Sequence, residues 1–133
     1  MSINILAVIL AAVASMVVGF VWYSMPVMGK HWLNAMGKKA SDFDKESANV
    51  GYAMAMVGAL VMSFVMAVLV NMTNTTGVVN GALLGLIGWA GFVFPSFMSN
   101  TVFEAKPWKL FLIDVGNYLV TFIVVGAIIG MWR

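Results

Sequence analysis

The sequence predicts an all-α fold, a polytopic membrane protein with four transmembrane helices in one domain, residues 1–133. Hydrophobic residues make up 62% of the chain and charged residues only 9%, and the mean hydropathy is +0.99. A soluble domain usually has about a quarter charged residues. Four apolar runs are each long enough to cross roughly 30 Å of hydrocarbon. Small residues recur at every fourth position of these runs, as on packed faces of membrane helices. Together these observations predict a four-helix bundle within a membrane.

The first predicted span covers residues 3–23. It has no positively charged n-region, so we expect a retained helix rather than a cleaved signal peptide. In lipid the hydrophobic effect does not drive helices together, so close contact at small side chains must hold them together. This span is expected to pack through a face formed by Ala7, Ala11, Ser15 and Gly19.

A mixed-charge loop, residues 29–49, separates the first span from the second. Ser41 precedes acidic residues and could begin a short surface helix with acids in its first turn, but a solvated loop is the favoured interpretation. The second and third spans, 50–72 and 78–97, are joined by the uncharged stretch NMTNTTG, which predicts a tight polar turn. Their small residues are Gly51, Ala55, Ala59, Ser63 and Ala67 in the second span and Gly77, Gly81 and Gly85 in the third.

The fourth span, residues 110–132, has one step of the small-residue pattern, Gly126 and Gly130. Lysines lie in the first and third loops, whereas the opposite ends carry only Arg133 and the amino terminus. Short lysine-rich loops stay in the cytoplasm. We therefore expect a multi-pass protein of the cell (inner) membrane with both termini outside the cytoplasm. The loop lysines are Lys30, Lys38, Lys39, Lys45, Lys106 and Lys109.

Two stretches of the chain show a faint internal repeat. Residues 19–24, GFVWYS, match residues 91–96, GFVFPS, and each is followed by a lysine and a tryptophan. Residues 50–52 likewise match residues 115–118. The pattern suggests two helical-hairpin repeats of the same orientation, as in parallel-repeat transport folds, and a chance similarity stands beside it as the alternative.

Asp114 is the acid that lies well inside an apolar run. Asn117 and Tyr118 follow at i+3 and i+4, which places them on its helix face. An ionisable group within a membrane is costly unless it is paired, so Asp114 is a functional candidate. A structural ion pair or cap is the favoured interpretation and a solute, ion or proton site the alternative. The cations that could neutralise Asp114 are Lys109, Lys106 and Lys30.

A second polar group surrounds the break between the third and fourth spans. Glu104 and Lys106 flank it, and Pro95 and Pro107 interrupt helical hydrogen bonding nearby. Asn100, Ser96 and Ser99 could satisfy the freed carbonyls. We favour an interfacial re-entry with snorkelling lysines. The alternative is a polar vestibule, open to the cytoplasm, that these residues form with the loop containing Lys30 and His31.

The remaining reactive groups are sparse. The chain has no cysteine, and His31 is its one histidine, so neither a metal site nor a catalytic residue is predicted. Met62 and Met66 are read as core filler rather than a copper path. The interfacial anchors are Trp22, Tyr23, Trp32, Trp108 and Trp132. The sequence predicts no cofactor, no enzymatic activity and no nucleic-acid partner.

Several motifs carry a resemblance to a known family. GFVWYSMPVMGKHW at residues 19–32, with GWAGF, FEAKPW and LFLIDVGNY between residues 88 and 118, resembles the bacterial domain-of-unknown-function family 1761, whose members are small four-helix membrane proteins. The resemblance covers nearly the whole chain. In that family a Trp-Tyr-Ser-Pro motif opens the first loop; here Met25 takes the proline position and Pro26 follows. The resemblance implies a fold and a location but no activity.

Two functions follow from these patterns. The first is a non-catalytic membrane module, in contact with membrane lipids, that forms a homo-oligomer or joins a larger membrane complex through its small-residue faces. The alternative is a small transporter or channel with a polar cytoplasmic-side site. Its candidate residues are Asp114, Asn117, Tyr118, Glu104, Lys106, Asn100 and Lys30.

Overall fold

The computed structural model describes residues 2–132. Arg133, one of the positive charges used to predict the orientation in the membrane, lies outside them. The described residues are helical and contain no β-strand. Four helical segments are long and apolar enough to cross a membrane, which confirms the predicted fold class. In chain order the elements are α1 (Ile5–Trp22), the π-turn η1 (Met25–Gly29), α2 (Lys30–Met36), the 3₁₀ turn η2 (Ala40–Asp42), α3 (Lys45–Met72), α4 (Val78–Gly88), the π-turn η3 (Trp89–Val93), α5 (Phe94–Phe103) and α6 (Trp108–Met131).

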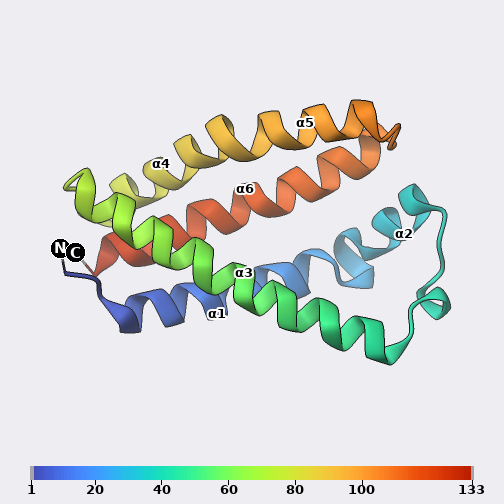
Figure 1. Ribbon diagram of the computed structural model, residues 1–133, viewed down its shortest axis with the longest axis horizontal. Helices are drawn as coiled ribbons and strands as arrows, with labels where there is room; N and C mark the ends of the chain where they lie inside the picture. Colours follow the sequence, from blue (N-terminus) through green and yellow to red (C-terminus); the bar gives the residue numbers. More distant parts are fainter. Residues whose placement is uncertain (1, 133) are drawn as a thin grey trace.

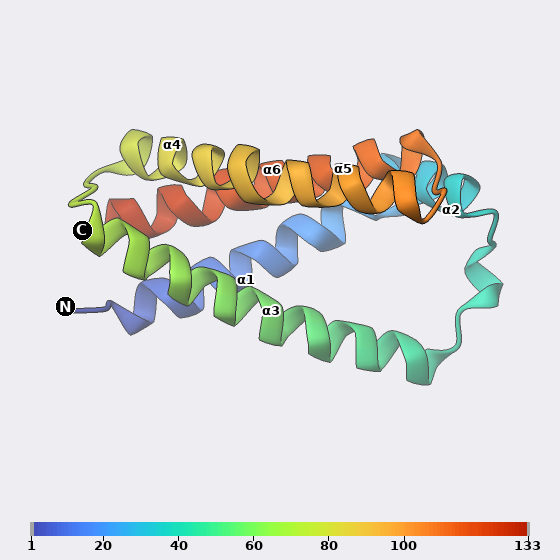
Figure 2. The same ribbon diagram turned by 45° about the horizontal axis from the view of Figure 1, so that its top comes forward.

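Helix α6 is the centre of the arrangement. Helix α1 packs along one side of α6 and α4 along another, and α3 packs mainly on α1 (Figures 1 and 2). Helix α3 makes few contacts with α4. The start of α1 and the end of α6 lie at one end of the molecule, and α2 and the α5–α6 turn lie at the other (Figure 1). Helices α1, α3 and α4 therefore all contact α6, and the helices do not form a closed ring.

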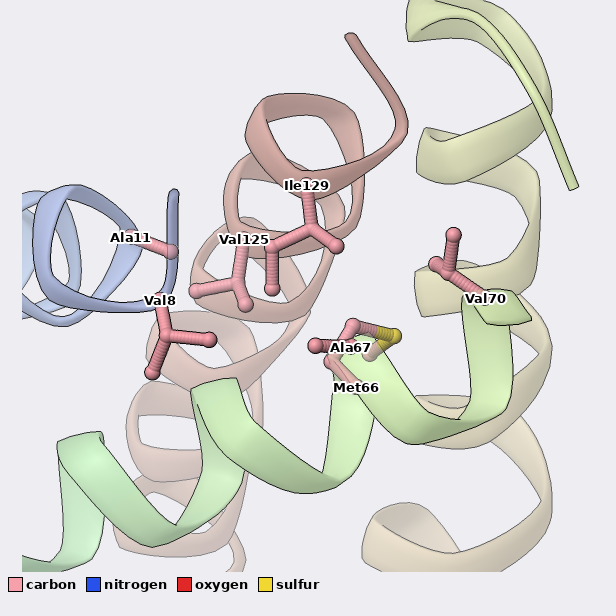
Figure 3. Close-up of a cluster of buried hydrophobic side chains, with 7 residues drawn as sticks. All are labelled: Val8, Ala11, Met66, Ala67, Val70, Val125 and Ile129. Carbon is pink, nitrogen blue, oxygen red and sulfur yellow. The ribbon is translucent and has the colours of Figure 1, made fainter. Parts of the chain in front are cut away.

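A small apolar core lies where α1, α3 and α6 meet. Figure 3 shows side chains of the three helices pointing toward one another. Val125 of α6 and Ala11 of α1 are fully buried, as is Val70 of α3. Dispersion contacts between such closely packed side chains hold membrane helices together. The cluster consists of Val8, Ala11, Met66, Ala67, Val70, Val125 and Ile129.

A close backbone contact joins α4 to α6. A Cβ atom added at Gly126 would overlap the carbonyl oxygen of Gly81, and one added at Gly81 would overlap that of Gly126. The backbone N–H of Gly77 donates to the carbonyl of Gly130 at 2.9 Å. The glycines predicted to form packing faces in the third and fourth spans therefore meet each other inside the chain.

In the second span, only part of the predicted small-residue face packs inside the chain. Ala59, Ser63 and Ala67 of α3 are buried, and so are Ala7 and Ala11 of α1. The first half of α3 is different, because every residue from 49 to 58 is exposed. Gly51 and Gly58 have no atom of another segment within 4 Å of an added Cβ. This half of α3 has a small-residue face without a partner.

The loop prediction for residues 29–49 needs correction. Lys30–Met36 already forms α2, and α3 begins at Lys45 rather than at residue 50. Ser41 lies within a single 3₁₀ turn and does not start a helix; the N-cap of α3 is Asp44, whose carboxylate accepts from the N–H of Ser47 at 2.6 Å. The uncharged stretch after α3 does form the predicted tight turn, with Gly77 at a φ of +91°.

Acid should loosen the first turn of α3. The hydrogen bonds from Ser47 lower the pKa of Asp44. A carboxyl group with a lower pKa when folded stabilises the fold fully above its unfolded pKa of ~4. That contribution is lost as the pH falls through the folded pKa. Hydrogen exchange at residues 45–48, corrected for intrinsic rates, should therefore accelerate below pH 4 in the wild type. In Asp44→Ala it should be fast throughout, and equal protection in the two proteins contradicts the capping role.

Candidate functional site

Asp114 is held by a tyrosine from the other end of the chain. The hydroxyl of Tyr23, the residue that ends α1, donates to Asp114 Oδ1 at 2.6 Å. Asp114 is half-buried on α6. A phenol with its ordinary pKa near 10 is protonated at neutral pH. Tyr23 therefore acts as a hydrogen-bond donor, and it leaves Asp114 Oδ2 free for another partner.

Two tryptophans fix the segment of α6 that carries Asp114. The indole N–H of Trp22 donates to the carbonyl of Ile113 at 3.0 Å, and that of Trp89 donates to the carbonyl of Val115 at 2.8 Å. The Trp22 ring also lies against Gly116, where an added Cβ would be 2.9 Å from it. Side chains from α1 and from η3 thus hold the α6 carbonyls on either side of Asp114, which orients this residue.

A hollow of about 410 Å³ opens beside Asp114. Its walls come from α2, from the turn that links α5 to α6, and from the first two turns of α6. Tyr23 supports the α2 wall, because its ring meets that of Trp32 at 5.5 Å. Apolar side chains dominate the lining, which consists of Trp32, Ala35, Met36, Ala105, Lys106, Pro107, Leu110 and Asp114. The hollow therefore combines an apolar wall with one acid and one lysine.

Lys106 forms its ion pair with Glu104 and not with Asp114. The Lys106 Nζ to Glu104 Oε2 distance is 2.8 Å, and both side chains are about half exposed. The hydrogen bond to Glu104 raises the pKa of Lys106, so the lysine remains charged at neutral pH. This is the one ion pair found within residues 2–132. The favoured sequence interpretation was a structural ion pair or cap for Asp114; within residues 2–132 the structure shows a hydrogen bond from Tyr23 and no ion pair of Asp114.

The other predicted site residues do not line the hollow. Asn117 is buried, and its Oδ1 has no hydrogen-bond partner. Tyr118 turns toward α5, where its ring meets that of Phe97 at 5.5 Å. Asn100 is exposed on α5, and Lys30 is exposed at the start of α2. Of the predicted vestibule, the structure brings together Asp114 and Lys106, with Glu104 beside the lysine.

A π-turn lies close to each of these tryptophans: η1 leads into α2 three residues after Trp22, and η3 begins at Trp89 itself. After Tyr23, the N–H of Gly29 donates to the carbonyl of Ser24 at 2.9 Å, and a Cβ at Gly29 would overlap the backbone there. Pro95 follows η3 without an N–H, and the hydroxyl of Ser96 donates to the carbonyl of Phe92 at 2.6 Å. π-Turns inside α-helices often mark functional sites.

Sequence reasoning missed Tyr23, Trp22 and Trp89 as site residues. It placed aromatic residues at span ends as anchors in the interface, an explanation that applies to any membrane helix. The GFVWYS motif contains the first two and was the available signal. A free carboxylate oxygen beside apolar walls suits a ligand that brings hydrogen-bond donors or positive charge.

Comparisons with known proteins identify the family of this chain. Searches of curated proteins and of solved structures found no match to the chain. The profile of the family described as "Protein of unknown function (DUF1761)" matches residues 6–130, nearly the full length. With its four helices able to span a membrane, the chain belongs to the DUF1761 family.

Proposed function

We propose that this protein is a non-catalytic membrane protein that binds a polar or cationic solute in the Asp114 hollow, in the manner of a small transporter or channel. The observation that carries the proposal is the half-buried carboxylate of Asp114, which a tyrosine orients and which forms no ion pair within residues 2–132. An acid inside a span is retained at a cost in stability unless it interacts with something. Its remaining oxygen is available beside the hollow.

The proposed orientation places the hollow on the cytoplasmic side of the cell inner membrane. Lys106 and Lys109 lie near it, as do the lysines that flank α2. Positive residues in short loops favour that side. Both termini are then outside. A ligand would enter from the cytoplasm or from the adjoining lipid leaflet.

Flux through proteoliposomes tests this function. We expect K⁺ or methylammonium to cross faster with the protein than in protein-free liposomes. Asp114→Asn should reduce that flux at least tenfold, because it removes the negative charge while conserving size. Glu46→Gln, which neutralises an exposed acid at the start of α3, should leave it unchanged. Equal flux in the wild type and Asp114→Asn for every solute that moves contradicts the role of Asp114. The absence of any flux contradicts transport.

A second proposed role is assembly with another copy of this chain through the first half of α3. Every residue from 49 to 58 is exposed, and Gly51 and Gly58 meet no other segment. The same kind of small-residue face joins α4 to α6 within the chain, so a helix of this sequence type fits it.

Bulky residues on this face should weaken the association. We expect the Gly51→Leu and Ala55→Leu double variant to shift the protein from dimer to monomer by native mass spectrometry in mild detergent. Val61→Leu, on an exposed position further along α3, is the control. A wild-type protein that is only monomeric and carries no other membrane protein contradicts this second role. If a different membrane protein co-purifies with the wild type and is lost in the double variant, that protein is the partner of this face and a second copy of the chain is not.

A further inference from the structure

The hollow contains the elements of a site for a zwitterion. Asp114 lies inside it with a free carboxylate oxygen, and Lys106 lines it from the turn before α6. Lys106 has three N–H donors, and Glu104 is the acceptor that the structure shows for them. Within residues 2–132 no cationic nitrogen lies within 4 Å of Asp114. An acid without a cation and a lysine with spare donors therefore share one hollow.

We propose that the hollow binds a primary ammonium group joined to a phosphate, the headgroup of phosphatidylethanolamine. This inference rests on the proposed function and specifies its ligand. The ammonium donates to Asp114, and Lys106 donates to the phosphate. The Glu104 carboxylate, paired with Lys106, lies on the same side and disfavours ligands with two negative charges.

The depth of the site fits a lipid headgroup. Asp114 is six residues after the start of α6 at Trp108, which is roughly 9 Å along a helix at ~1.5 Å per residue. A bilayer has interfacial layers outside its ~30 Å hydrocarbon core. Trp108 and Trp32 are near this end of the molecule, where aromatic belts usually lie. The apolar walls, among them Leu110 and Met36, suit the glycerol and first methylenes of a lipid.

The lining also discriminates between headgroups. A primary ammonium offers three N–H donors to a carboxylate, whereas the trimethylammonium of phosphatidylcholine offers none. Quaternary ammonium groups are usually bound in aromatic cages. Here Trp32 is the single aromatic residue of the lining. Phosphatidylglycerol brings a phosphate for Lys106 but no cation for Asp114. The site should therefore prefer phosphatidylethanolamine to both.

Native mass spectrometry of protein released from nanodiscs with equal amounts of the three lipids tests the inference. We expect phosphatidylethanolamine to be retained roughly tenfold over phosphatidylcholine, the effect of one charge-assisted hydrogen bond. Asp114→Asn should abolish the preference and Lys106→Gln should weaken it. Glu46→Gln should keep it. Ala35→Leu fills the hollow without changing any charge, so it should also lose the lipid even if Asp114→Asn folds poorly.

Each alternative result has a distinct meaning. Equal retention of the three lipids, with solute flux still sensitive to Asp114→Asn, overturns the headgroup and leaves the proposed function intact. Equal retention with flux insensitive to Asp114→Asn overturns both. A preference for phosphatidylglycerol that only Lys106→Gln removes overturns the role of Asp114. If ethanolamine in lipid-free detergent binds as tightly as phosphatidylethanolamine and displaces it, the ligand is a soluble amine. That result contradicts the proposal that the headgroup of a lipid occupies the hollow.

Discussion

Gly126→Ala should lower the free energy of unfolding by about 2–3 kcal/mol, the upper part of the range for overpacking a well-packed interface. The new Cβ would overlap the Gly81 carbonyl and lie 3.3 Å from the backbone nitrogen of Gly85. These are backbone atoms and cannot rotate away as a side chain can. Helices α4 and α6 would have to separate, and the hydrogen bond from Gly77 to Gly130 would be lost with them.

The measurement is unfolding in detergent, followed by circular dichroism. Gly58→Ala is the matched control, because that glycine is also inside a helix and has no neighbour within 4 Å of an added Cβ. It should unfold at or slightly above the wild-type midpoint, since alanine is the better helix former. If the two variants unfold at the same midpoint, α4 and α6 do not approach each other this closely.

Trp22→Ala should cost about 3 kcal/mol, in line with other truncations of large aromatic residues. It removes the ring that covers Gly116 and the hydrogen bond to the carbonyl of Ile113. Tyr23 is the next residue, so its hold on Asp114 should loosen too. Trp22→Phe keeps most of the ring and should cost only about 1 kcal/mol for the lost hydrogen bond.

A double variant separates the ring contact from the general loss of volume. The three atoms nearest to a Cβ added at Gly116 all belong to the Trp22 ring. Gly116→Ala should therefore destabilise the wild-type protein but have little further effect in Trp22→Ala. Phe103→Ala, at an aromatic residue that is 87% exposed, is the control for removal of a ring and should be near neutral. Additive effects of the two substitutions contradict the proposed contact.

Much of the fold follows from the sequence because its causes are local. The apolar runs define the four long helices, and the spacing of Gly77, Gly81 and Gly85 identifies a face that does pack closely. The start of α3 was placed too late because hydropathy detects lipid-compatible residues, whereas α3 continues past them to its cap at Asp44.

The site was harder to predict because it depends on contacts between distant parts of the chain. Asp114 and Tyr23 are 91 residues apart, and the choice of tyrosine over lysine depends on how α1 packs against α6. Helical spacing correctly places Asn117 and Tyr118 near Asp114 on a projection. The packing around α6 nevertheless buries Asn117 and directs Tyr118 toward Phe97. The π-turns change helix register. Pro95 predicts interrupted hydrogen bonding near η3, and Ser96 does bind the carbonyl of Phe92 there, but the residue pattern does not specify a π-turn.

The central position of α6 determines the order in which this protein can assemble. A ribosome makes the chain from its N-terminus, so α6 is the last of these helices to enter the membrane. Until then Trp22 lacks the Ile113 carbonyl and Tyr23 lacks Asp114, although α1 was inserted first. Helices α1 and α3 can already pack on each other, whereas α4 has its main partner only in α6. Final docking, including the completion of the Asp114 site, therefore follows the insertion of α6.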